Sequence, residues 1–334
     1  MGMKNRQWLI NDRPMGRPIK MSDFKPSVTE SRSPNVSEVL VKTRYLGFDP
    51  AQKGWMENNA NYMAPTHIGD VMTGSGIGDV IESNHPRFKK GDKVSGLLGW
   101  QDYATLSGEA LIKLEDNELL TANLGALGTP GLTAYFGLLK HGRPKPGDTV
   151  LVSGAAGATG SMVGQIAKLS GCRVIGIAGG PKKCRWIVDE LGYDAAIDYK
   201  NEDVDKRLNE LCKNAVNIFY DNVGGAILNS ALAHLAMKGR VVLCGGISRY
   251  DKGKMPAGPE NYFNLIFMRG TMEGFIVLDY KSEYPMAKEK ISNWIRSGDV
   301  KYKEDIQHGF DNIPKTLTRL FTGQNFGKQI LKMD

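Results

Sequence analysis

The segment from residue 150 to residue 160 constrains the fold of this chain more than any other. It reads Val-Leu-Val-Ser-Gly-Ala-Ala-Gly-Ala-Thr-Gly, with glycines at positions 154, 157 and 160. The residues before the first glycine predict a strand covered on both faces, and the apolar spacing from Met162 to Leu169 predicts a helix. Such a turn lets a pyrophosphate approach the backbone and the helix N-terminus, so it predicts a dinucleotide site. An ordinary strand-to-helix turn is the alternative.

Strand and helix signals divide the 334 residues into two domains. Residues 1–124 contain short strands separated by turn signals, which predict a β-barrel-like domain. From 125 to 300 strands and helices alternate, which predicts a doubly wound parallel sheet of the Rossmann type. The tail 301–334 returns to the style of the first domain, and we expect it to complete that domain. The predicted fold class is therefore α/β.

Three predicted elements of the second domain bear on its binding edge. Small apolar residues at helical spacing predict a helix over 124–139. A second helix is predicted over 226–237, with Gly239 ending it and a strand following at 240–244. A strand is predicted over 271–278.

Composition excludes several classes of function. The formal net charge of +7 is dispersed along the chain, so we expect no nucleic-acid partner. No run of 18 apolar residues is present, so we expect no membrane span. The four cysteines show no metal-ligand spacing, and we interpret them as free thiols of a protein in a reducing cytoplasm. We therefore predict no metal site.

The residues after the second predicted strand of the parallel sheet favour NADP(H) over NAD(H). That strand ends at Ala178 without the acid that binds the ribose hydroxyls of NAD, and Lys182, Lys183 and Arg185 follow. A lysine attracts a 2′-phosphate, whereas a carboxylate repels it. The alternative is that these cations only decorate a helix, but a helix N-terminus disfavours cations.

Polar and glycine residues also follow other predicted parallel strands. Asn222, Gly245 and Gly246 come directly after such strands, and ligands bind at the carboxyl ends of parallel sheets. For Asn222 the alternative is a turn residue before Gly224.

Motifs along nearly the whole chain resemble the medium-chain dehydrogenase/reductase superfamily. Within it the chain is similar to the zinc-free, NADP-dependent alkenal/one oxidoreductases, the group of the leukotriene B4 12-hydroxydehydrogenase/prostaglandin reductases and bacterial curcumin reductase. The motifs are Asn5–Trp8, Arg17–Pro18, Asp49–Pro50, Ser153–Ser161, Tyr220–Gly225, Cys244–Ser248 with Tyr250, Glu273–Val277 and Gly323–Lys328.

The resemblance implies a GroES-like substrate and catalytic domain beside a Rossmann NADP-binding domain, and a homodimer. It implies that residues 156–159 lie against the pyrophosphate, that Lys183 binds the 2′-phosphate and that 275–277 flank the nicotinamide. The residues that it places against NADP(H) are Ala156, Gly157, Ala158, Thr159, Lys183, Tyr199, Asn222, Cys244, Gly245, Gly246, Ile247, Ser248, Tyr250, Phe275, Ile276, Val277 and Asn325.

Two departures from the family pattern concern the substrate and the metal. In many relatives a tyrosine that lines the substrate pocket follows Asp-Pro, but here Ala51 stands in that place. We expect a wider pocket there, or one filled by Trp55 and Tyr62. The zinc ligands of the wider superfamily are absent, and His67 has no cysteine near it in the sequence.

The resemblance implies NADPH-dependent reduction of the C=C bond of α,β-unsaturated ketones or aldehydes, with hydride transfer to the β-carbon. The resulting enolate needs hydrogen-bond donors, and we assign these to the cofactor ribose hydroxyl and to Tyr250, with Tyr262 as second choice. The alternative role for Tyr250 is that of a wall of the substrate pocket without proton chemistry. The alternatives are a quinone reductase of the same superfamily and a non-catalytic NADPH-binding member.

Overall fold

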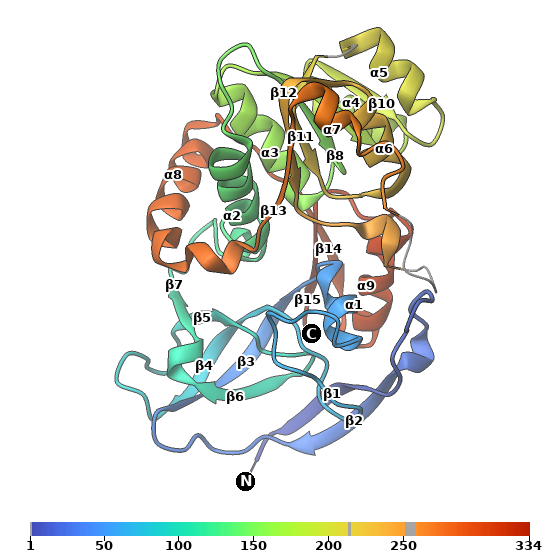
Figure 1. The fold of residues 1–334 in the computed structure, drawn as a ribbon. Helices are drawn as coiled ribbons and strands as arrows, with labels where there is room; N and C mark the ends of the chain where they lie inside the picture. Colours follow the sequence, from blue (N-terminus) through green and yellow to red (C-terminus); the bar gives the residue numbers. More distant parts are fainter. Residues whose placement is uncertain (1, 213–214, 251–257) are drawn as a thin grey trace. The chain divides into compact units, whose positions relative to one another are not determined.

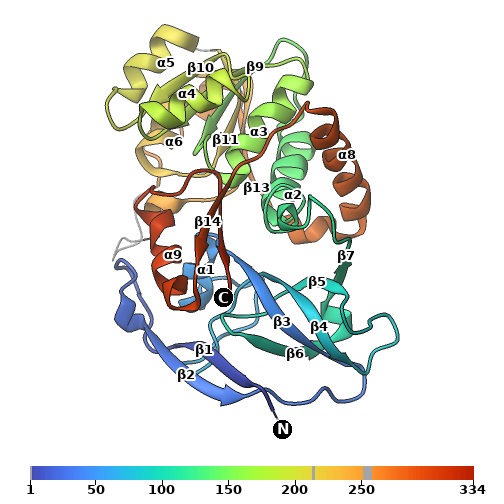
Figure 2. The ribbon, with the colours of Figure 1, turned by 180° about the vertical axis from the view of Figure 1, so that it is seen from behind.

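The computed structural model describes residues 2–212, 215–250 and 258–334. The chain forms two units, which we describe separately (Figures 1 and 2). The first consists of Met1–Leu124 together with Glu304–Asp334, and the second of Gly125–Lys303. The predicted combination of a separate strand-rich domain with a Rossmann sheet is confirmed.

The first unit contains a two-stranded sheet, β1-β2, and a sheet of order β14-β15-β3-β4-β5-β7, with β6 paired to β3. Strand β15 pairs with β3 through Ile330 and Gly47, so the C-terminal strands extend the N-terminal sheet. Its elements are β1 (Lys4–Ile10), β2 (Phe24–Glu30), β3 (Glu38–Gly47), α1 (Ala51–Met56), β4 (Gly76–Ser83), β5 (Lys93–Gly96), β6 (Tyr103–Ser107), β7 (Ile112–Leu114), β14 (Glu304–His308), α9 (Ile313–Phe321) and β15 (Lys328–Lys332).

An aromatic cluster forms one core of the first unit. The rings of Phe24 and Trp100 lie 4.9 Å apart, and Phe48 packs on the same indole at 5.7 Å. Helix α9 adds Ile313 and Leu317, both fully buried, from one apolar face. The N- and C-terminal segments therefore share one hydrophobic core.

The second unit is built on six parallel strands in the order β10-β9-β8-β11-β12-β13. The glycine turn follows β8, which lies between β9 and β11 and is buried along its whole length. The strands are β8 (Thr149–Ser153), β9 (Arg173–Ala178), β10 (Ala195–Asp198), β11 (Val216–Asp221), β12 (Leu235–Leu243) and β13 (Thr271–Gly274). The strand order reverses between β8 and β11, the place where such sheets bind ligands.

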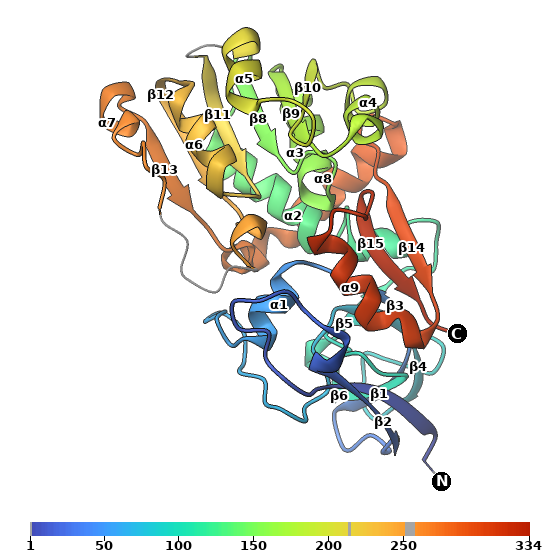
Figure 3. The ribbon, with the colours of Figure 1, turned by 90° about the vertical axis from the view of Figure 1, so that its right-hand side faces the viewer.

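Helices cover both faces of this sheet (Figure 3). Helix α2 packs on α3 and α8, and α5 packs on α6. The helices are α2 (Thr129–Phe136), α3 (Ala158–Leu169), α4 (Pro181–Asp189), α5 (Val204–Cys212), α6 (Gly225–Ala233), α7 (Asn264–Met268) and α8 (Tyr284–Ser297).

Three predicted elements have other bounds in the structure than the sequence indicated. The helix predicted over 226–237 ends at Ala233, and β12 begins at Leu235, because that leucine is fully buried and joins the core of the sheet. Lys238 has a positive φ of 59°, which helical backbone does not allow. The helix predicted over 124–139 is α2 followed by a π-turn at 137–142. The strand predicted over 271–278 ends at Gly274.

Candidate functional site

The glycine turn after β8 is tight and leaves no room for a side chain at Gly160. Gly154 has a φ of +61°, and the N–H of Gly157 donates to its carbonyl oxygen at 2.9 Å. A Cβ on Gly160 would lie 2.3 Å from the same oxygen. None of the described side chains caps the amino end of α3. The N–H groups of its first turn therefore remain available to an anion.

The adenosine end of the predicted site lies at the carboxyl end of β9. The ring of Tyr199 covers Gly179 so closely that a Cβ there would lie 2.9 Å from Cε1. Lys183 lies in the first turn of α4, which contains no acidic residue. The structure thus brings a tyrosine ring, a glycine and a lysine-bearing helix N-terminus to one strand end.

A carboxylate that the sequence interpretation missed organises this end. Asp198 is buried, and its Oδ1 accepts a hydrogen bond of 2.7 Å from the N–H of Gly180. Burial opposes ionisation, but hydrogen bonds from Asn201 and Gly180 outweigh it and lower the pKa of Asp198. The carboxylate at this edge therefore belongs to β10 and not to the end of β9. It holds the backbone turn before α4.

The carboxyl ends of β8 and β11 are joined by a second carboxylate. Oδ1 of Asp221 accepts hydrogen bonds from the Ser153 hydroxyl at 2.8 Å and from the N–H groups of Val223 at 3.0 Å and Gly224 at 2.9 Å. Asn222 donates to Ser153 twice, from its N–H to the hydroxyl oxygen and from Nδ2 to the carbonyl oxygen. The amide of Asn222 thus fixes the turn, in line with the turn alternative; its predicted cofactor contact remains a prediction.

Asp221 is almost fully buried, and burial raises the pKa of its carboxyl group. Its Oδ2 is buried and has no hydrogen-bond partner among the described residues. Burying a carboxyl group with one oxygen unpaired costs free energy. The three hydrogen bonds that Oδ1 accepts offset this cost.

The loop after β12 packs on the loop after β11. The N–H of Cys244 donates to the carbonyl oxygen of Asp221 at 2.9 Å. The hydroxyl of Ser248 donates to the carbonyl oxygen of Val223 at 2.6 Å. A 3₁₀ turn at Ile247–Arg249 follows, and Tyr250 comes directly after it. The predicted nicotinamide-side residues from 244 to 250 therefore lie at the same sheet edge as the glycine turn.

The thiol in this loop is not a reactive one. Burial raises the pKa of Cys244 to about 12, so it is protonated at neutral pH. Burial likewise raises the pKa of Tyr220, whose hydroxyl donates to the carbonyl oxygen of Thr133 at 2.8 Å. Both groups are structural members of the edge.

The second tyrosine considered for catalysis is exposed. Tyr262 has an exposed fraction of 52%, and its ring lies 4.9 Å from that of Phe263. It precedes α7, whereas Tyr250 follows the turn after β12. The residues from 251 to 257 lie outside the described ranges.

The predicted substrate-pocket residues belong to the first unit. Ala51 and Trp55 are on α1, and Tyr62 is in the loop after it, with an exposed fraction of 41%. Trp55 lines a cavity of about 220 Å³ together with residues of the same loop, including Asn58 and Met63, and neither Ala51 nor Tyr62 lines it. Of the three predicted pocket residues, Trp55 is therefore the one that lines this cavity.

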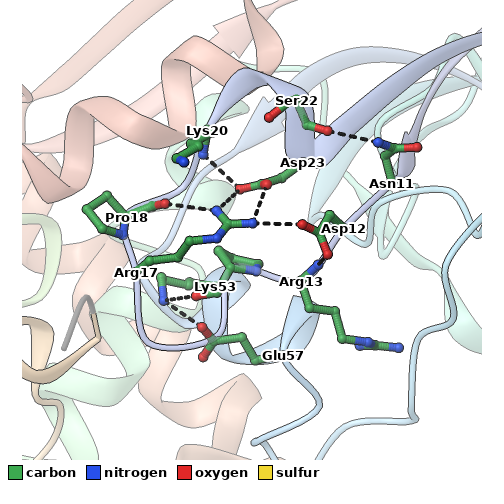
Figure 4. A network of polar contacts seen from close by, with 11 residues as sticks. Asn11, Asp12, Arg13, Arg17, Pro18, Lys20, Ser22, Asp23, Lys53 and Glu57 are labelled. Atoms are coloured by element: carbon green, nitrogen blue, oxygen red, sulfur yellow. Dashed lines mark hydrogen bonds and ion pairs between the residues drawn. The ribbon is translucent and has the colours of Figure 1, made fainter. Parts of the chain in front are cut away.

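Buried polar contacts fix α1 (Figure 4). Nζ of Lys53 is fully buried and lies 2.6 Å from Oε1 of Glu57 and 3.0 Å from the carbonyl oxygen of Pro14. The guanidinium of Arg17 pairs with both oxygens of Asp23, at 2.7 and 2.9 Å, within the segment between β1 and β2 that also contains Pro14. A helix of six residues has little stability of its own, so these contacts hold the pocket residues in place.

Asn325 also belongs to the first unit, where its Nδ2 donates to the carbonyl oxygen of Gly327 at 3.1 Å. It lies between α9 and β15, in the turn that the sequence indicated. Its predicted contact with the cofactor remains a prediction.

The described residues offer neither a metal cluster nor a membrane span. No three His, Cys, Asp or Glu side chains in these ranges are grouped so that they could hold a metal ion. No helix of the described chain combines the length and apolar character of a membrane span.

The residues of the sheet edge fit a dinucleotide. The glycine turn has no room for a side chain at Gly160, and no described side chain caps the helix after it. The first turn of α4 holds lysines and no acid. These features supply backbone donors for a pyrophosphate and a cation for a further phosphate.

The chain matches two protein-family models. The one described as "N-terminal domain of oxidoreductase" matches residues 6–114. The one described as "Zinc-binding dehydrogenase" matches residues 158–293.

Three curated reductases are similar over nearly their whole length. The NADPH-dependent curcumin reductase of Escherichia coli (strain K12) is 38% identical over 99% of this chain and 97% of the relative. The 2-alkenal reductase (NADP(+)-dependent) of Nicotiana tabacum is 38% identical over 98% and 97%. Prostaglandin reductase 1 of Rattus norvegicus is 37% identical over 98% of each chain.

A solved structure is also similar over nearly the whole length of both chains. CurA from Vibrio vulnificus in complex with NADPH is 38% identical and matches with a TM-score of 0.93, over 98% of this chain and 99% of that chain.

Proposed function

Because the chain belongs to the medium-chain dehydrogenase/reductase superfamily, together with curcumin, 2-alkenal and prostaglandin reductases, we propose that it reduces the C=C bond of α,β-unsaturated ketones and aldehydes. It is an NADPH-dependent oxidoreductase of this type. One observation carries the proposal. The glycine turn, the lysine-bearing turn of α4 and the loop 244–250 follow β8, β9 and β12 and lie along one carboxyl edge of the parallel sheet.

The chain's own residues hold the cofactor in the proposed reaction. The turn 156–159 binds the pyrophosphate, Lys183 binds the 2′-phosphate and Tyr199 lies at the adenosine end. When bound, NADPH supplies the hydride for the β-carbon and a ribose hydroxyl as a hydrogen-bond donor. The loop 244–250 and the segment 275–277 position the nicotinamide half.

Negative charge that develops on the substrate carbonyl oxygen needs donors aimed at it. We assign this role to the phenol of Tyr250, which the 3₁₀ turn Ile247–Arg249 holds at the sheet edge. The same hydroxyl is suited to deliver the proton that the α-carbon requires. Trp55 and Tyr62 are the proposed walls of the substrate pocket.

The test is a substrate panel of 2-alkenones, 2-alkenals and quinones at one NADPH concentration, with NADPH oxidation followed by absorbance. NADPH deuterated at C4 of the nicotinamide identifies the acceptor atom. The expected product is the saturated ketone or aldehyde with deuterium at the β-carbon. An allylic alcohol, or turnover of quinones alone, contradicts the proposal.

A non-catalytic NADPH-binding protein is separated from an enzyme by the same panel. NADPH that quenches tryptophan fluorescence without being oxidised by any panel member indicates binding alone. The intact glycine turn and the loop that carries Tyr250 favour an enzyme.

We also propose a homodimer formed through β13, which is an edge strand of the parallel sheet. Unpaired strand edges invite pairing, and α7, which precedes β13 in the chain, exposes Ile266 and Phe267, each by 65%. Light scattering after size-exclusion chromatography tests this, and a monomer at micromolar concentration contradicts it. The cytoplasm is the proposed location, because all four cysteines are free thiols.

A further inference from the structure

A histidine connects three elements of the second unit. His141 lies near the end of the π-turn that follows α2, and its side chain is exposed by only 11%. Its Nδ1 lies 2.8 Å from Oε1 of Glu273 on β13. Its Nε2 lies 2.7 Å from the hydroxyl oxygen of Tyr280, in the 3₁₀ turn Val277–Glu283. Both nitrogens of a mostly buried imidazole therefore have partners.

The same imidazole packs on the residue between its two partners. The rings of His141 and Phe275 are stacked, with centroids 5.0 Å apart and planes inclined by 24°. The histidine thus holds the segment from Glu273 to Tyr280 at both ends and supports its middle.

Other contacts fix this segment further. A Cβ on Gly137 would lie 2.4 Å from Cζ of Phe275, so the phenylalanine ring rests directly on the backbone of the π-turn. The hydroxyl of Tyr284 donates to the carbonyl oxygen of Val277 at 3.0 Å. The ring of Tyr280 stacks on Phe136 with centroids 4.8 Å apart.

The position of the segment explains what such support achieves. Gly274, the last residue of β13, pairs with Leu243, after which the loop 244–250 begins. The segment 275–277 therefore starts at the carboxyl edge of the sheet, beside the loop proposed to hold the nicotinamide half of the cofactor. It has no strand partner of its own beyond Gly274 among the described residues, so side-chain contacts must set its position.

We propose that His141 is a positioning residue for the nicotinamide half of NADPH, acting through Phe275. This inference rests on the proposed function. Its contacts to Glu273 and Tyr280 and its stacking on Phe275 hold the segment 275–277 where the nicotinamide binds. Removing the imidazole leaves the adenosine half of the site intact, because Lys183 and Tyr199 lie at the opposite end of the sheet edge, beside β9 and β10.

The test compares a whole cofactor with its adenosine half. NADPH and adenosine 2′,5′-bisphosphate are titrated against the full chain, with the fluorescence of bound NADPH as a second signal. For His141→Ala we expect NADPH affinity to fall about 5-fold and kcat to fall at least about 10-fold, because small displacements near reacting atoms are costly. The affinity for adenosine 2′,5′-bisphosphate should equal that of the wild type.

Two further variants keep the test decisive if His141→Ala does not fold. His141→Phe retains the ring on Phe275 and loses both polar contacts. Its NADPH affinity and kcat should therefore lie between those of the wild type and those of His141→Ala. Tyr280→Phe retains the stacking on Phe136 and loses one polar contact, so its effect should be smaller.

The matched control is His234→Ala. His234 is also buried, and its Nε2 lies 3.1 Å from a carboxylate oxygen of Asp205. It precedes β12 and so lies at the opposite edge of the same sheet. Its loss should lower the thermal midpoint without changing either affinity or kcat.

Three results overturn the inference. In the first, the His141 variants match the wild type. In the second, the affinities for both ligands fall in parallel, which indicates general damage. In the third, His234→Ala has the same effect. A wild-type protein that binds neither ligand overturns the proposed function itself.

Discussion

The hydroxyl of Ser153 donates a 2.8 Å hydrogen bond to Oδ1 of Asp221 and so joins the ends of the two central strands, β8 and β11. The same oxygen accepts from two backbone N–H groups of the following turn. One buried carboxylate therefore shapes both the glycine turn and the loop that carries Asn222.

Replacing this carboxylate tests how much the edge depends on it. Asp221→Ala leaves three donors without an acceptor and should cost at least about 2 kcal/mol of unfolding free energy. It should also weaken NADPH binding. Asp221→Asn keeps an acceptor oxygen and should cost less than about 1 kcal/mol. Urea unfolding and NADPH titration of both variants measure this, and equal losses would show that the acceptor does not matter.

The raised pKa of Asp221 predicts a pH dependence with a definite sign. The folded state favours the neutral acid, so this group's stabilising contribution is present below its ordinary pKa of 3.8 and is lost as the pH rises through the raised value. The unfolding free energy of Asp221→Asn should therefore improve relative to wild type as the pH rises.

Urea midpoints of the two proteins between about pH 3 and about pH 8 measure this difference. Asp189→Asn, which removes an exposed carboxyl group on α4, is measured beside it as the control substitution. A difference between Asp221→Asn and wild type that does not change with pH refutes the prediction.

Gly160 should not tolerate a side chain. Its Cβ would lie 2.3 Å from the backbone oxygen of Gly154, which cannot move without opening the turn. We expect Gly160→Ala to cost about 1–3 kcal/mol of unfolding free energy and to weaken NADPH binding.

Gly54→Ala is the matched control for the glycine turn. A Cβ there meets no atom within 4 Å, and the residue lies in a helix. It should leave NADPH affinity unchanged and stabilise the protein by up to about 1 kcal/mol. Thermal unfolding and fluorescence titration separate the two variants, and equal NADPH affinity in both would show that the turn is not part of the site.

Local patterns predicted the elements that hold the site. The strand before the glycine turn and the helix after it follow from apolar periodicity. The run after Ala233 misled the prediction because Leu235 and Ala236 continue a helical spacing. What ends the helix is the burial of Leu235 beside Val216, a contact between residues distant in the sequence.

The missed residues act across strands rather than along them. Asp198 lies on β10 but fixes the turn after β9, and Glu273 meets His141 through the fold alone. Neither pairing can be predicted from the sequence, because the spacing between the two partners follows no pattern. The carboxylates that shape the sheet edge can therefore be identified only from the structure, whereas its glycines can be identified from the sequence.

Lys183 should determine the preference for NADPH over NADH. A charged hydrogen bond to the 2′-phosphate is worth enough that Lys183→Ala should weaken NADPH binding about 10- to 100-fold. NADH affinity should not change, because that cofactor lacks the phosphate. Lys206→Ala, on the exposed face of α5, is the control and should affect neither cofactor. Equal losses for both cofactors with Lys183→Ala contradict a role in phosphate recognition.

Tyr250 should contribute to turnover and not to cofactor binding. If its hydroxyl donates to the enolate oxygen, Tyr250→Phe should lower kcat about 100-fold while the dissociation constant of NADPH stays unchanged. Tyr262→Phe provides the comparison, because that residue is 52% exposed and was the second choice for the same role.

Steady-state kinetics with a 2-alkenone and fluorescence titration with NADPH, made on both tyrosine variants, locate the donor. A low kcat for Tyr250→Phe alone assigns the donor to the loop after β12. A low kcat for Tyr262→Phe alone moves the donor to the segment before α7. Wild-type kcat in both variants removes the phenols from the reaction, and the cofactor ribose hydroxyl is then the donor that remains.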